Sequence, residues 1–112
     1  MQGNISLLAK SFIAAGTLAQ FQPVQASGIA AVAAGNAIGS ANVSAVVGDI
    51  FPATVMGTAL FVAGAAIAVG AQVEVHTTVT QVVTKAAGIA IGRALNATSA
   101  AGDFVEVLLI PN

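Results

Sequence analysis

The sequence has 112 residues, the length of one domain, and 57% of them are hydrophobic. It carries only three Lys or Arg and four Asp or Glu, which gives a formal net charge of -1. Nucleic-acid binding needs a stripe of basic side chains to neutralise phosphates, so this composition excludes it. The sequence also has no Cys, which excludes a disulfide framework and a thiolate metal site.

At the N-terminus, Ile5, Leu8 and Phe12 are spaced to share one face of a helix. The same segment is equally compatible with an extended arm. We expect an N-terminal arm over residues 1–11 and one β domain over residues 12–112.

Alternation and β-branched residues predict strands after the arm. In Gln72–Thr77, Val and Thr alternate with polar residues, as in a half-buried strand. Phe104–Ile110 alternates in the same way with apolar residues on both faces, which predicts a strand covered on both sides. Pro23 and Pro52 are expected at edges or bends, because neither can donate to a β-ladder. The strands that we expect are Leu18–Val24, Gly28–Val32, Ala37–Val47, Ile50–Val62, Gln72–Thr77, Val79–Thr84, Ile89–Ala97 and Phe104–Ile110.

The turn signals between these strands have the spacing of a β-sandwich or a small β-barrel. Residues 33–41 also match residues 86–94 at most positions. The match is either a coincidence in an Ala- and Gly-rich chain or the sign of two equivalent turn-plus-strand units. The predicted fold is therefore mainly β, a compact single domain with little helix.

The most apolar uncharged stretch, Ala53–Val73, allows a second interpretation. Its length suits a membrane-spanning helix. However, Ala and Gly dominate it, the sequence has no Trp or Tyr, and no cluster of Lys or Arg sets an orientation. Two strands around Ala63 and Gly64 are the favoured interpretation.

The few polar side chains do not form a recognisable site. His76 is the only His, and Glu74, two residues before it, would share its strand face, which we interpret as solvated. Asp49 and Asp103 follow Gly and indicate turns. Glu106 alternates with core positions and is interpreted as a solvent-facing or interface charge.

Sequence motifs for catalysis are also missing. Residues 88–94 lack the Lys and the hydroxyl residue of a phosphate-binding loop, and no Gly-x-Ser-x-Gly elbow is present. We therefore predict no catalytic residue, no cofactor-binding residue and no metal ligand, and we expect that the protein is not an enzyme.

The order of several short segments resembles a known family. The segments are Phe12–Gly16, Phe21–Val24, Ala37–Ala41, Ala66–Val73, Ile91–Leu95 and Ala101–Leu109. The last two are the most specific, because a Gly-x-Ala-Leu strand precedes a Gly-Asp turn and an alternating strand. Together they resemble the small capsid-cement, or head-decoration, proteins of tailed bacteriophages.

This resemblance implies a compact β domain that binds the outer surface of an assembled phage head and stabilises the shell. The implied partners are the major capsid protein and further copies of the chain, as a homotrimer, with no membrane and no nucleic acid. Two other functions stay open: another virion component such as a fibre or spike base, and a small membrane protein that spans near residues 53–73.

The predicted arm supplies the candidate partner-binding residues. Leu7 and Leu8 are apolar but stand beside polar residues, so an arm would expose them. The candidates for contact with the capsid or another partner are Ile5, Leu7, Leu8, Lys10 and Phe12.

Overall fold

The computed structural model describes residues 6–25, 27, 35–78 and 80–109. The predicted strand Gly28–Val32 and the predicted strand ends Val79 and Ile110 lie outside the described residues.

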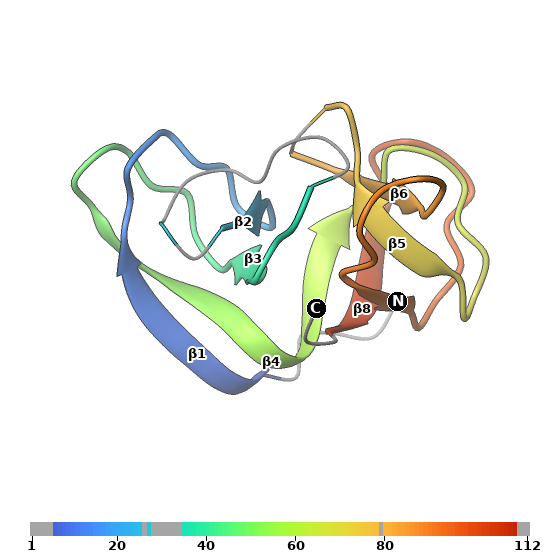
Figure 1. Ribbon diagram of the computed structural model, residues 1–112, viewed down its shortest axis with the longest axis horizontal. Coiled ribbons are helices and arrows are strands. Elements are labelled where there is room, and N and C mark those ends of the chain that lie inside the picture. Colours follow the sequence, from blue (N-terminus) through green and yellow to red (C-terminus); the bar gives the residue numbers. More distant parts are fainter. Residues whose placement is uncertain (1–5, 26, 28–34, 79, 110–112) are drawn as a thin grey trace.

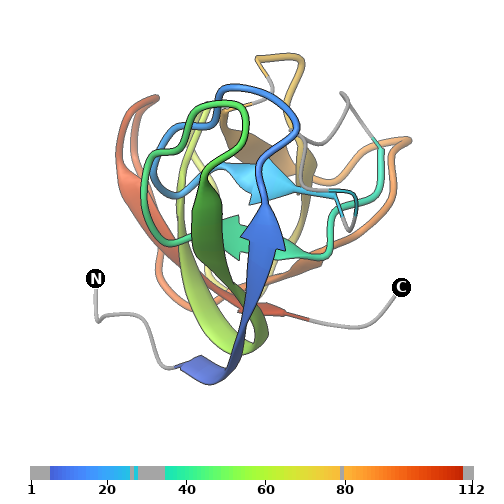
Figure 2. The ribbon, with the colours of Figure 1, turned by 90° about the vertical axis from the view of Figure 1, so that its left-hand side faces the viewer.

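The described residues form antiparallel β-structure and no helix, which confirms the mainly β prediction. The neighbouring strands follow the order β2-β3-β4-β8-β7-β5-β6, and β1 pairs with β4. The sheet curls around the interior (Figures 1 and 2). The strands are β1 (Ser6–Ile13), β2 (Pro23–Val24), β3 (Gly39–Ala41), β4 (Ile50–Val62), β5 (Gln72–Val75), β6 (Val82–Thr84), β7 (Gly92–Ala94) and β8 (Phe104–Leu109).

Strand β4 organises the molecule. Its first half pairs with β1 and β3, and its second half pairs with β8. The change of partner falls next to Gly57, whose φ of 97° is a left-handed conformation that favours glycine. Phe51 in the first half and Phe61 in the second half are fully buried in two separate hydrophobic cores. One long strand therefore joins two cores.

Most predicted strands are present but shorter than expected. Strand β4 has the predicted bounds, whereas the predicted strand Leu18–Val24 contains only the two residues of β2 and one isolated bridge at Leu18. The chain turns at Phe21, which has a φ of 63° and so interrupts the extended backbone. Similarly, bends after Ala41 end β3.

The N-terminal segment is a strand in the described part, so the helical alternative is wrong there. Ser6–Ile13 pairs with β4, with Phe12 opposite Phe51. The predicted boundary after residue 11 falls inside this strand.

The interpretation of Ala53–Val73 as a spanning helix is also wrong. The segment continues β4 to Val62 and then turns into β5. Within the part of the chain that the structure describes, no helix is long and apolar enough to cross a membrane.

The two prolines differ in how they fit the prediction of an edge or a bend. Pro23 lies in β2, at the end of the strand order, as predicted. Pro52 lies inside β4, where it is opposite Ser11 of β1 and its carbonyl accepts the Asn42 N–H at 3.0 Å, so the prediction is wrong for it. Pro52 has no N–H to return this bond to the Asn42 carbonyl, which instead accepts the Gln20 side-chain amide at 3.1 Å.

Apart from β6, the described residues of the two halves of the chain make equivalent strand pairs, and we name the described part of residues 6–57 the first repeat and that of residues 58–109 the second repeat. They lie side by side along the long axis (Figure 1). In the first repeat, Phe12 and Phe51 are partners between β1 and β4; in the second, Phe61 and Val105 are partners between β4 and β8.

The strand pairs that follow are equivalent as well. Val24 of β2 is opposite Gly39 of β3, and Val73 of β5 is opposite Gly92 of β7. A Cβ atom at either glycine would collide with a backbone carbonyl of the neighbouring strand. The equivalence of the two turn-plus-strand units is thus confirmed for their described residues, and both need glycine for the same close approach of backbones.

The closing turns complete the correspondence. The Ala14 N–H donates to the Asp49 carbonyl at 2.7 Å, and the Ala63 N–H donates to the Asp103 carbonyl at 2.7 Å. Gly48 and Gly102 both have positive φ, 92° and 93°, at the same place in their turns. The second half of β4 therefore takes in the second repeat the place that β1 takes in the first.

Candidate partner-binding surface

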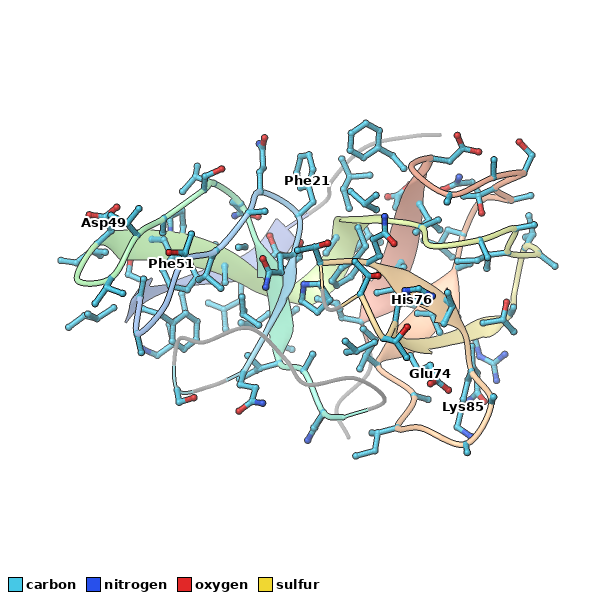
Figure 3. The ribbon with its side chains drawn as sticks, turned by 90° about the horizontal axis from the view of Figure 1, so that it is seen from above. Phe21, Asp49, Phe51, Glu74, His76 and Lys85 are labelled. Atoms are coloured by element: carbon cyan, nitrogen blue, oxygen red, sulfur yellow. The ribbon has the colours of Figure 1, made fainter. Side chains whose placement is uncertain are left out.

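A group of exposed aliphatic side chains lies at the outer end of the first repeat. The group, which we name the first-repeat tip, consists of Ile13, Val46, Val47 and Ile50, which are 66%, 57%, 68% and 73% exposed. The β1–β4 register places Ile13 opposite Ile50. The turn beside them ends at Asp49, which Figure 3 shows at one end of the molecule. Four large aliphatic side chains close together in water are typical of a surface that another molecule covers.

The turn itself is held firmly. The Asp49 Oδ2 atom accepts the Val46 N–H at 3.0 Å, and the Asp49 N–H donates to the Val46 carbonyl at 3.0 Å. This confirms the prediction that Asp49 belongs to a turn. Because side chain and backbone close the same turn, Val46 and Val47 are presented on fixed backbone.

The equivalent positions in the second repeat are different. Val62 takes the place of Ile13, and two alanines, Ala100 and Ala101, take the place of Val46 and Val47. Phe104 takes the place of Ile50, and its ring meets the Phe21 ring of the first repeat edge to face, with centroids 5.6 Å apart. The second repeat thus has smaller side chains here, and its one large side chain is in contact with the first repeat.

The predicted binding residues lie on or before β1. Lys10 and Phe12 come together, because the Lys10 ammonium lies 5.1 Å from the centre of the Phe12 ring. Phe12 is half-buried and its ring centroid lies 6.0 Å from that of Phe51, so it contributes to the first core. Leu8 is 48% exposed. Ile5 and the side chain of Leu7 lie outside the described part.

Sequence reasoning missed the first-repeat tip. Val46 and Val47 stand directly before Gly48-Asp49, and Ile50 directly after it. Aliphatic residues that flank a turn on both sides were the available signal, but they were assigned to the ends of two strands. Side chains at strand ends face the core as often as solvent, so the sequence alone did not separate the two cases.

Glu74 contradicts the interpretation of a solvated face. It is only 8% exposed, and its Oε1 atom accepts the Ala86 N–H at 2.5 Å and the Gly88 N–H at 3.1 Å. The carboxylate therefore fixes the loop after β6. His76 lies just beyond β5, and its Nδ1 atom accepts the Thr78 N–H at 3.0 Å (Figure 3 labels both side chains). No group of metal-ligating side chains occurs among the described residues.

Glu106 is buried, so its assignment as a solvent-facing charge is wrong. It is 1% exposed, and its Oε2 atom accepts the Thr58 hydroxyl at 2.8 Å, whereas Oε1 has no hydrogen-bond partner. Its neighbour on the same face of β8, Phe104, contacts the first repeat. Leu108, also on this face, is 42% exposed and Phe104 is 44% exposed, so the prediction that the strand is covered on both sides is wrong for this face, where Glu106 alone of the described residues is buried.

Asp103 closes the second-repeat turn as Asp49 closes the first, which confirms its predicted role. Its Oδ2 atom accepts the N–H groups of Ser99 at 3.1 Å and Ala100 at 3.2 Å. These backbone donors hold the pKa of the Asp103 carboxyl below its ordinary value, because they stabilise the ionised form.

The comparisons with known proteins fit this structure. The model of the phage cement protein family matches residues 5–109, so the chain belongs to that family. The fold is similar to that of a solved structure, the head fibre gp8.5 N base of bacteriophage phi29. The TM-score is 0.73 at 15% identity, and the match covers 92% of this chain and 93% of the other. No curated protein matches the sequence.

Family membership states the role of the protein in general terms. The chain is a structural protein of the phage head that binds the capsid and stabilises it. At 15% identity the likeness to the head fibre base shows the shared fold alone.

Proposed function

We propose that the protein binds the outer surface of the assembled head through the major capsid protein, as a homotrimer and without catalytic activity. The observation that carries the proposal is the first-repeat tip on a chain with so few charges. Interface cores are depleted of charged residues, and rigid aliphatic side chains lose little entropy when another surface covers them.

Because many copies of a small domain bind one shell, each contact with the capsid can be weak and the shell is still stabilised. A bound oligomer brings several equivalent surfaces to neighbouring capsid subunits at once, so each further contact forms at a high effective concentration. This supports a clamp across subunit seams that needs neither a cofactor nor a ligand pocket. The three Lys and Arg residues are too few for a basic stripe, which supports a protein that does not contact nucleic acid, and we propose no membrane contact.

The predicted residues of β1 belong to this proposal. Leu8 is exposed, and Lys10 is the only charged side chain among residues 1–11, the predicted arm. We propose that Leu8 and Lys10 contact the partner together with the predicted residues Ile5 and Leu7, while Phe12 keeps β1 on the first core.

Co-sedimentation with capsids that lack the protein tests the proposal. We expect saturable binding at a fixed ratio to the major capsid protein, and weaker binding after Leu8→Asp. Ala19→Asp, at another exposed site that lies away from β1, is the control. Purified protein that stays in the supernatant at every concentration would contradict the proposal.

A second function has one observation in its favour. The solved structure with the same fold is the base of a head fibre. A base of this kind would bind the head in the same way and would also carry a fibre. Electron microscopy of decorated capsids separates the two functions, because a fibre base leaves projecting density in the virion and a cement protein leaves a flat cap.

A further inference from the structure

The two repeats are joined head to tail. The turn that carries Phe21 in the first repeat packs on Phe104, at the tip position of the second repeat. The equivalent turn of the second repeat carries Val69 and Gly70, since the N–H groups of Phe21 and Gly70 make the same hydrogen bond to β3 and β7. The acceptors are the carbonyls of Ala41 at 2.7 Å and Ala94 at 2.8 Å.

This arrangement leaves the turn of the second repeat and the tip of the first repeat without a contact of this kind. If the repeats were related by a two-fold axis, the turn at Val69 would contact Ile50, as the turn at Phe21 contacts Phe104, which stays 44% exposed. Instead, Val69 is 65% exposed and Ile50 is 73% exposed. The loop between β4 and β5 lies at the end of the long axis opposite to the first-repeat tip (Figure 1). The chain is therefore an open pair of repeats with a free tip and a free turn.

The two free surfaces are both apolar and have opposite charges beside them. Val69 is an exposed aliphatic side chain on a tight turn, and the tip is a group of aliphatic side chains. The Arg93 guanidinium lies beside this turn, where it donates to the Gly70 carbonyl at 2.9 Å. Asp49 lies in the turn of the tip. An opposite pair of charges at the edge of an apolar contact fixes its register and excludes wrong orientations.

We propose that the Val69–Gly70 turn of one copy seats on the first-repeat tip of another copy. The seam between copies then joins the two positions that Phe21 and Phe104 join inside each chain, with Gly70 and Ile50 in their places and Val69 as the apolar side chain of the turn. Such a contact is heterologous, because it joins two different surfaces, and it closes into a ring when the rotation between copies allows it. The inference rests on the self-association in the proposed function and names the surfaces that produce it.

Sedimentation velocity with single and mixed variants tests the seam. The variants are Ile50→Asp, Val69→Asp and the control Ile89→Asp, which replaces an aliphatic residue that is 44% exposed elsewhere in the second repeat. At about 100 µM, a concentration at which contacts of micromolar affinity are saturated, the unchanged protein and the control should be oligomers. Ile50→Asp and Val69→Asp should each be monomers.

The mixture gives the sharpest result. Ile50→Asp keeps an intact turn and Val69→Asp keeps an intact tip, so an equimolar mixture should form a heterodimer and nothing larger. Circular dichroism of each variant should match the unchanged protein, because both side chains are exposed. A mixture that stays monomeric while both variants are folded overturns the seam.

Two other outcomes also overturn it. If Val69→Asp associates as the unchanged protein does and Ile50→Asp does not, the tip meets a surface other than the turn. If the unchanged protein is a monomer but binds capsids saturably, the seam fails and the proposed function stands. An oligomer with the predicted variant pattern that never binds capsids keeps the seam and overturns the proposed function instead.

Discussion

At the same place in the fold, the second repeat has Phe104 against Phe21, and the first repeat has Ile50, which is 73% exposed. The turns that close the repeats have the same hydrogen bonds, so backbone structure does not explain this difference. It lies in the contacts that the two positions make: the first repeat covers part of Phe104, which is 44% exposed, and nothing within the described part of the chain packs on Ile50 in the same way.

Equivalent positions of two repeats can therefore have different functions. Phe104 contacts the other repeat within the chain, and its counterpart Ile50 is available to a partner. Phe21 shows the cost of the internal contact. It has a φ of 63°, where the equivalent residue is Gly70, so an aromatic side chain occupies a backbone conformation that suits glycine.

The largest difference in stability between equivalent substitutions of the two repeats should appear in the cores. Phe61 is fully buried in the second core, whereas its equivalent Phe12 is half-buried in the first. Phe61→Ala should lower the free energy of unfolding by about 3–5 kcal/mol, because it leaves a cavity. Phe12→Ala should cost about half as much, since less surface is removed from water. Urea denaturation measures both, and equal losses would contradict the difference in burial.

The close approach of backbones should be equally important in both repeats. Gly39→Ala and Gly92→Ala should each cost about 1–3 kcal/mol, because the added Cβ pushes two strands apart. Gly16→Ala is the matched control, as no atom lies within 4 Å of its Cβ position and its φ is not positive. Thermal unfolding shows the result; a tolerated alanine at only one of the paired positions would break the equivalence of β3 and β7.

The buried carboxyl of Glu106 should make the second repeat sensitive to a lost hydroxyl. Thr58→Val removes a donor to Glu106 and should cost about 1–3 kcal/mol, because a buried carboxyl group then loses a hydrogen bond. Ser40→Ala, which removes the hydroxyl bonded to the Leu60 carbonyl at 2.8 Å, should cost about 1 kcal/mol. In a double-mutant cycle, Glu106→Gln should reduce the loss caused by Thr58→Val. Additive losses would show that the two side chains are not coupled.

The contact between Phe21 and Phe104 should have a smaller and asymmetric effect. Phe104→Ala should cost about 1–2 kcal/mol through the lost ring contact and the lost burial. Phe21→Gly removes the same contact but relieves the positive φ, which is worth about 1 kcal/mol, so the net loss should be smaller. Equilibrium denaturation of the two variants compares them directly. A larger loss for Phe21→Gly would mean that the backbone at Phe21 is not strained.

The smallest expected effect concerns the aspartates of the two turns. The pKa of Asp103 is lowered in the folded protein, so its contribution to stability is full above the unfolded pKa of about 4 and is lost as the pH falls through the folded value. Asp103→Asn should therefore flatten the fall in Tm at acidic pH. Asp49→Asn should change this profile less, because the Asp49 carboxyl accepts fewer backbone N–H groups than the Asp103 carboxyl does. Indistinguishable profiles would contradict the lowered pKa of Asp103.

The sequence was sufficient for the fold class and for strands with clear alternation. Strand β4 has its predicted bounds, and the described part of β8 follows the alternating apolar residues after Gly102-Asp103. The similarity of residues 33–41 to 86–94 indicated the repeats. Short strands such as β2 were overestimated, because positive φ at a non-glycine residue such as Phe21 cannot be read from its side chain.

The candidate surface was predicted less well than the fold. Leu8 and Lys10 are exposed as the sequence indicated, but the first-repeat tip was assigned to strand ends. Whether an aliphatic residue near a turn faces a core depends on which repeat packs against it, and this is a tertiary property. The burial of Glu106 was not predicted for the same reason, since its face of β8 lies beside the junction of the repeats.

Hydrogen–deuterium exchange of the protein at a dilution at which it is monomeric, and of the capsid-bound protein, tests whether a partner covers the first repeat. Amides of residues 46–50 should exchange more slowly in the bound state, while those of the equivalent residues 100–104 should change little. Those second-repeat residues already have Phe104 in contact with the first repeat. Slower exchange at residues 100–104 with no change at residues 46–50 would contradict the assignment of the first repeat to the partner.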